Sequence, residues 1–460
     1  MLGGLAMNLY AGGSGLNTVV VINQSRTNSI ELGNYFCERR QVPPENVLRI
    51  NWSGANTAWT SAEFQTVLLD PLLTMLAARQ LTSQIGYVVL AMDIPFQTVY
   101  GSTVNSTTAA LFYGLKNTSG SEGAEVRNSY AGSEQDFHQA RPVSAPGASF
   151  LTTMLTAGSL AQAKRLVDQG VNSDGTFPTQ TVVLAKSPDW LRNLRYLAFD
   201  HALFNTRLSP AKGYSITRTN AALPGESNLL GLQTGLVNFS LPPNVFVPGA
   251  MADSMTSFGG VIFGANDHTT LLAFIHAGAA GSYGTVSEPL TAVDKFPSPQ
   301  NYFYQSRGFT LAECYYQSLA IPYQGLIVGE PLAAPWRQLA TGSWMDVVSN
   351  ATLSGTAQLR VSFSAADAGH PPQHMDLFVD GKFLRTLTNL PPQPGNVLNL
   401  NLRNQSLSYV VPANATLASV ASNLTTLLNL PANTNATQTA AAVNGDRITL
   451  RSLAPKRPAA

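Results

Sequence analysis

The sequence predicts an α/β fold with a mainly parallel, doubly wound sheet, followed by a β-rich C-terminal domain. Short apolar runs such as TVVVIN (18–23) and GLIVGE (325–330) alternate with helical segments up to about residue 336. Strands that are apolar throughout are typical of parallel sheets covered by helices on both faces. Beyond residue 336 the pattern changes to short strands broken by Gly, Pro and Asn turns. A chain of 460 residues is long enough for two domains or more.

The first domain alternates expected strands with expected helices. The strands are 18–23, 47–52, 86–95, 181–187, 280–286 and 325–330. The helices are 29–40, 61–80, 159–169, 189–204, 269–277 and 310–320. Two stretches rich in Gly, Asn, Ser and Pro, 100–149 and 205–247, are expected to be long insertions. Insertions of this length in a compact domain are usually functional or disordered.

Four segments follow from these patterns. Residues 1–17 form an N-terminal extension, and residues 18–340 form the α/β domain with its two insertions. Residues 345–453 form the β-rich domain, which includes one expected helix at 416–428, and residues 454–460 form a basic tail. In the β-rich domain the sequence VDGK predicts a hairpin turn in which Gly381 has a positive φ.

The composition narrows the possible partners and the location. Lys and Arg total 27 against 26 acidic residues, so the chain has no overall field to hold a nucleic acid. No stretch is long and apolar enough to be a transmembrane segment, and the first 17 residues do not predict a signal peptide. Charged residues make up 12% of the chain, and Asn, Ser, Thr and Gly supply the polar surface. This surface is typical of exported bacterial proteins and favours a secreted or cell-envelope location.

The two cysteines, Cys37 and Cys314, each fall inside an apparently amphipathic helix. Free cysteine behaves as a small apolar residue, so both are expected to be buried free thiols. No CxxC or Cys/His metal pattern is present in the sequence.

The stretch 266–289, NDHTTLLAFIHAGAAGSYGTVSEP, is the predicted location of a chemical site. Asp267 and His268 begin the expected helix, so His268 is the candidate general base and Asp267 the carboxylate that orients it. The alternative is that Asn266 or Asp267 caps the helix. Ser282, in AGSYG, is the candidate hydroxyl, but it lies in a strand after a helix, the reverse of a nucleophile elbow. The glycines around it would instead let the strand approach a neighbouring backbone closely.

Several carboxylates follow or flank the expected strands. Glu288 comes directly after one strand, where open α/β sheets place functional side chains, and Asp93 and Glu330 follow two others. Together with Asp253 they could hold a hard cation such as calcium, which prefers oxygen ligands. Asp253 and Glu288 are therefore the candidate metal ligands, and the alternative is that these acids cap helices and turns.

Several stretches of the first 336 residues resemble an uncharacterised bacterial family known mainly from genomes that carry exosortase protein-sorting systems. They are VVVINQSRTNSIELGNYFCERRQVPPENVLRI, SFLTTMLTAGSLAQAKRLVDQG, TSFGGVIF, LLAFIHAGAAGSYGTVSEP and GLIVGEPLAAPW. More distantly, GAAGSYG and GEP resemble the end of the gingipain-type cysteine peptidases, which implies a caspase-like fold. Those peptidases pair a His with a Cys, whereas AMADSMTSFGG (250–260) contains neither residue and Cys314 falls too late in the chain. Thiol peptidase chemistry is therefore not expected.

Two functions remain open. The first is an exported hydrolase that cleaves an ester, lactone or amide bond with His268, Asp267, Ser282 and Glu288. The second is a non-catalytic surface or matrix-binding protein on a caspase-like frame. The expected partner in either case is a small molecule, a peptide or a polysaccharide.

Overall fold

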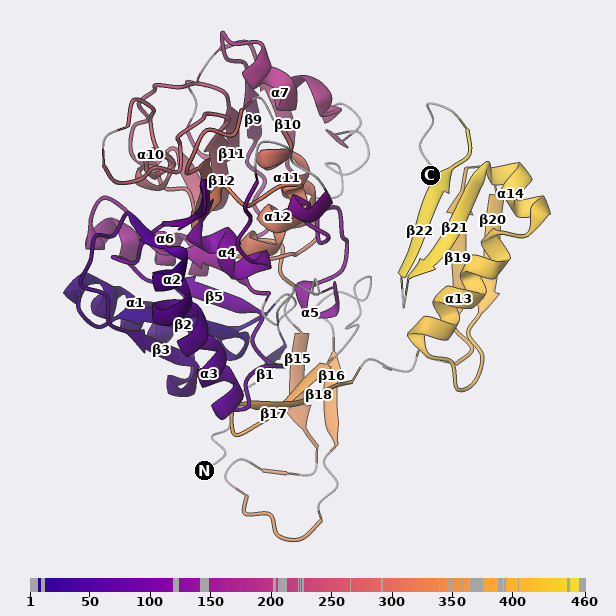
Figure 1. Ribbon diagram of the computed structural model, residues 1–460. Coiled ribbons are helices and arrows are strands. Elements are labelled where there is room, and N and C mark those ends of the chain that lie inside the picture. The colour runs from indigo at the N-terminus through magenta and orange to yellow at the C-terminus, as the bar shows by residue number, and fades with distance from the viewer. Residues whose placement is uncertain are drawn as a thin grey trace. The chain divides into compact units, whose positions relative to one another are not determined.

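The protein is described here from a computed structural model. The structure describes residues 7–9, 13–118, 124–140, 149–201, 204–205, 213–221, 223, 225, 227–264, 266–290, 293–338, 340–345, 347–348, 351–356, 360–364, 375–387, 392, 394–403, 405–444 and 447–454. The chain divides into two compact units, one formed by Tyr10–Leu339 and the other by Met1–Leu9 with Ala340–Ala460. The first unit holds a large sheet, and the second holds several small antiparallel sheets (Figure 1).

A ten-stranded sheet forms the centre of the first unit, with the strand order β10-β9-β11-β12-β13-β14-β8-β5-β2-β3. In chain order these strands are β2 (Thr18–Asn23), β3 (Val47–Ile50), β5 (Tyr87–Leu90), β8 (Leu151–Met154), β9 (Val182–Ala185), β10 (Ile216–Thr219), β11 (Leu229–Thr234), β12 (Phe246–Ser254), β13 (Gly281–Thr285) and β14 (Gly325–Gly329).

The sheet consists of two groups of parallel strands joined through β14. Neighbours among β3, β2, β5 and β8 are parallel, and so are neighbours among β10, β9, β11, β12 and β13. β14 is antiparallel to β13, with Gly281 opposite Gly329 and Thr285 opposite Gly325, and it meets β8 at Val328 and Met154. The orders β3-β2-β5-β8 and β10-β9-β11-β12 share one arrangement. In each, the strand that comes second along the chain (β3 or β10) lies outside the strand that comes first (β2 or β9).

Helices cover both faces of the sheet. Leu326 and Val328 of β14 belong to the core that contains residues of α1 and α6, whereas Ile327 belongs to the core that contains residues of α4 and α12. These helices are α1 (Thr27–Arg40), α4 (Thr107–Tyr113), α6 (Leu160–Val171) and α12 (Leu311–Ser318). The predicted α/β class with a mainly parallel sheet covered on both faces is confirmed.

The second expected insertion differs from the structure. Residues 205–247 contain β10 and β11, which are strands of the central sheet, and β12 starts at the end of this stretch. The sequence of β11, LLGLQT, mixes Gly and Gln with leucines, yet all six residues are buried. The first expected insertion, 100–149, begins where β6 (Gln97–Tyr100) ends and contains β7 (Thr103–Ser106), and these two strands form a small sheet with β4 (Ala58–Thr60).

The second unit is built from hairpins and two helices. The β-strands are β1 (Met7–Leu9), β15 (Ala340–Trp344), β16 (Val361–Ser364), β17 (Met375–Val379), β18 (Lys382–Leu387), β19 (Val397–Leu402), β20 (Gln405–Val410), β21 (Thr439–Asn444) and β22 (Arg447–Ser452). The helices are α13 (Leu417–Leu428) and α14 (Pro431–Thr437). Val420 and Leu424 of α13 form a small core with Leu400, Tyr409 and Ile448. Gly381 has a φ of +76° in the turn between β17 and β18, as VDGK predicts.

Asparagine side chains brace the backbone at several loops and strand edges. In each case the amide oxygen accepts the N–H of one residue and the amide nitrogen donates to the carbonyl of that same residue, as a neighbouring strand would. We call this arrangement an asparagine clamp. The pairs are Asn23 with Trp52, Asn105 with Lys116, Asn193 with Ser187, Asn205 with Ile216, and Asn429 with Ala441.

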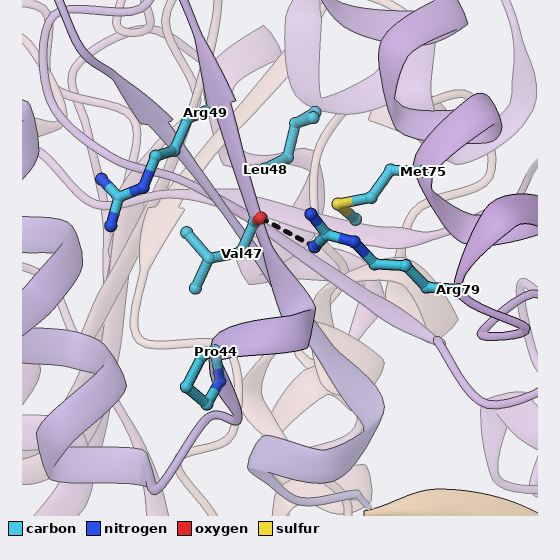
Figure 2. A pocket seen from close by; sticks show the side chains of 6 residues that line it. All are labelled: Pro44, Val47, Leu48, Arg49, Met75 and Arg79. Atoms are coloured by element: carbon cyan, nitrogen blue, oxygen red, sulfur yellow. Dashed lines mark hydrogen bonds between the residues drawn. The ribbon is translucent and has the colours of Figure 1, made fainter.

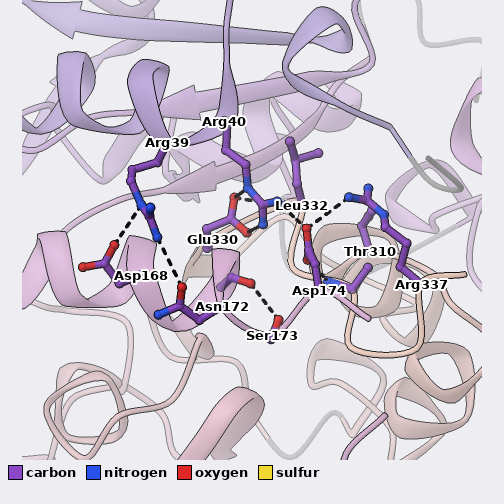
Figure 3. A network of polar contacts seen from close by, with 12 residues as sticks. Arg39, Arg40, Asp168, Asn172, Ser173, Asp174, Thr310, Glu330, Leu332 and Arg337 are labelled. Carbon is purple, nitrogen blue, oxygen red and sulfur yellow. Dashed lines mark hydrogen bonds and ion pairs between the residues drawn. The ribbon is translucent and has the colours of Figure 1, made fainter. Parts of the chain in front are cut away.

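A buried ionic network ties the ends of several elements together (Figure 3). Glu330, directly after β14, is fully buried and accepts bonds of 3.0 Å and 2.5 Å from the guanidinium of Arg40 at the end of α1. Asp174 accepts from both Arg40 and Arg337. Burial raises the pKa of Glu330, and the charge of Arg40 opposes that rise. Because these partners satisfy the carboxylates, the network is structural.

Candidate functional site

The loops after β9, β11, β12 and β13 gather at one edge of the sheet, because these strands are parallel neighbours. Open α/β sheets bind ligands outside the carboxyl ends of their strands. The loops at this edge include residues 186–193, 255–260, 266–270 and 286–290. We call them the carboxyl-edge loops.

Gly284 in β13 allows the loop after β12 to lie directly against the strand. A Cβ at Gly284 would lie 2.4 Å from the backbone of Gly259 and Gly260. The Gly260 N–H donates to the Thr285 carbonyl at 2.9 Å, and the Thr285 hydroxyl donates to the Ser257 carbonyl at 2.7 Å. The close approach predicted for the glycines around Ser282 is therefore present, and it fixes the position of Phe258.

His268 lies in a loop rather than at the start of a helix. Helix α10 begins only at Leu272 and ends at His276. The Asn266 side chain accepts the His268 N–H at 3.0 Å and donates to the carbonyls of Phe258 and Val261, so it holds the loop and not a helix end.

The imidazole of His268 is oriented by Phe258. Its Nδ1 accepts the backbone N–H of Phe258 at 3.4 Å, and the two rings pack edge to face with centroids 5.5 Å apart. Since a backbone N–H can only donate, Nδ1 carries no proton in the neutral ring and Nε2 carries it. His268 therefore presents an N–H donor through Nε2.

The surroundings of His268 favour its neutral form. Partial burial lowers the pKa of His268, and the positive charge of Arg192 lowers it further. Glu288 and Asp267 act in the opposite direction, which places both carboxylates in the vicinity of the ring. Among the described residues, however, no carboxylate or hydroxyl makes a hydrogen bond to the imidazole.

Arg192 and Trp190 come from the segment after β9, which contains a 3-10 turn (Leu191–Asn193) and helix α7 (Leu194–Ala198). The clamp of Asn193 on Ser187 folds this segment back over the end of β9. Gly235 makes room for it, because a Cβ there would lie 2.5 Å from the Cβ of Arg192. Trp190 is 69% exposed, which is unusual for so large an aromatic side chain.

A buried ion pair lies at the ends of the strands that carry these loops. Asp253 in β12 is 1% exposed, and its carboxylate accepts from the guanidinium of Arg195 and from the Gln233 amide. Arg195 also donates to the carbonyls of Thr234 and Pro297, each at 3.0 Å. Burial raises the pKa of Asp253, and Arg195 opposes that rise. The pair fixes the ends of β11 and β12.

The structure separates the remaining predicted site residues. Ser282 is fully buried within β13, and its hydroxyl has no hydrogen-bond partner among the described residues. Glu288 and Asp267 are exposed, and Glu288 Oε1 accepts the N–H of Leu290 at 2.9 Å. His268 and the two exposed carboxylates are thus brought together, whereas Ser282 lies inside the sheet. The catalytic assignment stays a prediction.

The predicted convergence of four carboxylates is not found. Glu330 follows β14, which is antiparallel to β13, so it lies at the opposite edge from Glu288. Asp93 follows β5 in the other group of parallel strands, and the oxygens of Asp253 are occupied by Arg195 and Gln233. Within the described ranges, no group of three or more His, Cys, Asp or Glu residues could hold a metal ion. A calcium site at Asp253 and Glu288 stays a prediction.

Both cysteines are free, Cys314 buried and Cys37 partly buried. Burial raises the pKa of Cys37 to about 11 and that of Cys314 well above its usual value. Thiols with raised pKa values are poor nucleophiles near neutral pH.

Sequence reasoning missed Arg192, Trp190 and Phe258. Their roles depend on loops from different strands meeting at one edge, which local periodicity does not reveal. The sequence SPDW at 187–190, a turn with a tryptophan directly after an apolar strand, is the signal that could have indicated the first two.

No family model matches the chain, and no curated protein matches it. A solved structure described as "Structure of Protease" is similar, with 10% sequence identity and a TM-score of 0.46 over 81% of this chain and 89% of that chain. The mainly parallel sheet with its antiparallel β14 is consistent with a caspase-like fold. Across the described residues, no helix has the length and apolar character needed to cross a membrane.

Proposed function

We propose that this chain binds a polysaccharide or a similar polar, uncharged chain at the carboxyl-edge loops, without cleaving it. The observation that carries this proposal is the hydrogen bond from the Phe258 N–H to Nδ1 of His268. It leaves Nε2 as a donor, which suits recognition of a hydroxyl or carbonyl oxygen better than abstraction of a proton.

The other groups at this edge suit the same ligand. Trp190 offers an exposed apolar face of the kind on which a sugar ring stacks through its C–H groups. Arg192 pairs with Asp189 at 3.4 Å and remains partly exposed, so it can donate to a neutral ligand without adding net charge. Asp267 and Glu288 carry two negative charges near His268 against the one positive charge of Arg192, which disfavours a strongly anionic ligand.

The candidate catalytic residues Ser282 and Glu288 and the candidate metal ligand Asp253 have structural roles that compete with chemistry. Ser282 is enclosed in the sheet, Glu288 braces its own loop, and Asp253 is neutralised by Arg195. A nucleophile must lie within hydrogen-bond reach of its base, and Ser282 does not reach His268 here.

The test is a glycan-array measurement on the whole protein, followed by affinity measurements with the captured oligosaccharide. Trp190→Ala and His268→Ala should each weaken binding, by roughly tenfold for the loss of a stacked ring or a buried donor. His276→Ala is the matched control, since His276 is the last residue of α10 and bonds to Gln162. Binding that is unchanged in Trp190→Ala and His268→Ala would refute the proposal.

The competing function is an exported hydrolase acting on an ester, lactone or amide bond. It is favoured by the effect of two carboxylates, Glu288 and Asp267, which act to raise the pKa of His268 at the carboxyl edge. A screen of model esters, lactones and peptides, with and without chelator, separates the two functions. Turnover that is lost in His268→Ala and kept in His276→Ala would establish the hydrolase and end the binding-only proposal. An association with exosortase systems and a cell-envelope location are part of either proposal, and fractionation of the native host would test them.

A further inference from the structure

The pocket beside strand β3 does not form an anion site, although two arginines line it. It has a volume of about 410 Å³ and is lined by Pro44, Val47, Leu48, Arg49, Met75 and Arg79. Figure 2 shows Arg49 and Arg79 on opposite sides of the strand, so their guanidinium groups do not converge on one ligand. Leu48 and Met75 are each 7% exposed and offer little apolar surface. The group best placed to respond to its surroundings is instead His268, at the carboxyl-edge loops.

The hydrogen bond from the Phe258 N–H to Nδ1 of His268 exists only while the imidazole is neutral. It spans 3.4 Å between the two nitrogens. A protonated imidazole carries a hydrogen on both nitrogens, so it has no acceptor for a backbone N–H. Protonation therefore turns this contact into one between two donors.

The backbone of Phe258 is held on both sides and cannot turn away from the ring. The loop after β12 lies against β13 because Gly284 has no side chain. The Gly260 N–H donates to the Thr285 carbonyl at 2.9 Å, and the Thr285 hydroxyl donates to the Ser257 carbonyl at 2.7 Å. The group that is free to move is therefore the imidazole, which is half-buried and lies in an irregular loop.

Two carboxylates can receive the ring once it is protonated. Partial burial lowers the pKa of His268, and the charge of Arg192 lowers it further, whereas Glu288 and Asp267 act to raise it. Both carboxylates belong to exposed residues. The ring is therefore neutral at neutral pH, and it takes up its proton only in acid. The imidazolium is then attracted to these two carboxylates.

The neighbouring loops add one further charge. Asp189, in the loop after β9, pairs with Arg192 at 3.4 Å. The stretches 234–240 and 255–260, which follow β11 and β12, contain no acidic, basic or histidine residue. The response of this edge to pH therefore depends on the imidazole and the two carboxylates.

We propose that His268 is a pH switch for the carboxyl-edge loops, in which the neutral ring is held by Phe258 and the protonated ring turns toward the two carboxylates and releases the ligand. The release of a ligand rests on the binding function proposed above, whereas the turn of the ring needs no ligand. Because only the neutral form binds, the affinity should fall up to about tenfold for each unit of pH below the pKa of His268.

The first test follows the ring and the amide by NMR, in the whole chain without ligand. With histidine rings and phenylalanine amides labelled, the two signals are identified by their loss in His268→Gln and in Phe258→Leu. On acidification from about pH 7.5 to about pH 5, the Phe258 amide should shift with the same midpoint as the His268 ring. It should not shift in this way in His268→Gln. A Phe258 amide that stays still while His268 titrates, or that shifts equally in His268→Gln, would overturn the switch.

The second test measures the affinity for cellohexaose, chitohexaose and maltohexaose over the same range of pH. An oligosaccharide that binds should lose about tenfold or more in affinity on acidification, in the parent and in the control His276→Ala. In His268→Gln the affinity, whatever its level, should not depend on pH. Binding by the parent that does not change with pH would overturn the switch and leave the binding function intact. Absence of binding at any pH, with the Phe258 amide still following His268, would support the switch and count against the binding function.

Discussion

Replacing Arg195 by Met should destabilise the first unit strongly, because it leaves the Asp253 carboxylate buried without its cation. Asp253 is 1% exposed and Arg195 is 4% exposed, so water cannot replace the lost partner. Breaking a buried pair in this way costs roughly 3 to 5 kcal/mol. That is a large part of the stability of an ordinary domain, about 5 to 15 kcal/mol.

The loss should depend on pH in a defined direction. Burial already raises the pKa of Asp253 from 3.8, and Arg195 opposes the rise, so the pKa should climb further in the variant. A carboxyl whose folded pKa exceeds its unfolded pKa stabilises the fold at low pH and loses that contribution as pH rises. The deficit of Arg195→Met should therefore be smaller at pH 5 than at pH 8.

Urea unfolding at pH 5 and pH 8 measures both effects. The double variant Arg195→Met/Asp253→Leu is the control, and it should recover most of the lost stability, because no buried charge remains. A deficit below about 1 kcal/mol at pH 8, or one that does not change with pH, would show that the pair is not buried as described. Recovery of the single variant on adding calcium would instead identify Asp253 as a metal ligand.

Three further substitutions test the scaffold. Gly284→Ala should lower the free energy of unfolding by about 1 to 3 kcal/mol and weaken ligand binding at the carboxyl-edge loops, because its Cβ meets backbone. Gly225→Ala places its Cβ in open space and should change neither stability nor binding. Calorimetry measures the stability, and ligand titration measures the binding. Asn23→Leu should lower the urea midpoint by the equivalent of about 2 to 4 kcal/mol, since it leaves four backbone groups without their partner, and an unchanged midpoint would contradict the clamp. Burial and the charge of Asp136 raise the pKa of Glu313 to about 7, so the free energy of unfolding should fall by about 3 kcal/mol between pH 4.5 and 7. Glu313→Gln should remove this dependence of stability on pH. If the dependence persists in the variant, another group causes it.

The strands of the central sheet could be predicted where their sequence is apolar throughout. TVVVIN and GLIVG are buried along their whole length and lie where the periodicity puts them, whereas the strand expected over 86–95 is only YVVL, Tyr87–Leu90. β11 could not be predicted because Gly231 lies under the ring of Tyr302, and a Cβ there would be 2.3 Å from that ring. A glycine that serves a contact distant in sequence looks, locally, like a loop residue.

The candidate site was predictable in its place but not in its chemistry. The stretch 266–289 does contribute loops to the carboxyl edge, as strand order and polar residues suggested. The helix expected to start at Asp267 starts instead at Leu272, because Asn266 bonds to the loop after β12. The tautomer of His268 is determined by the backbone N–H of Phe258, ten residues earlier in the chain. Only the folded loop brings that N–H to the imidazole ring.

The asparagine clamps make the fold vulnerable to a particular chemical change. Hydrolysis of an asparagine amide to a carboxylate replaces a donor with an acceptor. In a clamp the lost donor faces a carbonyl, at Ser187 for Asn193 and at Ile216 for Asn205, so two oxygens would then confront each other. Deamidation at a clamp would therefore loosen the loop or sheet edge that the asparagine braces, and would add one negative charge at the same position.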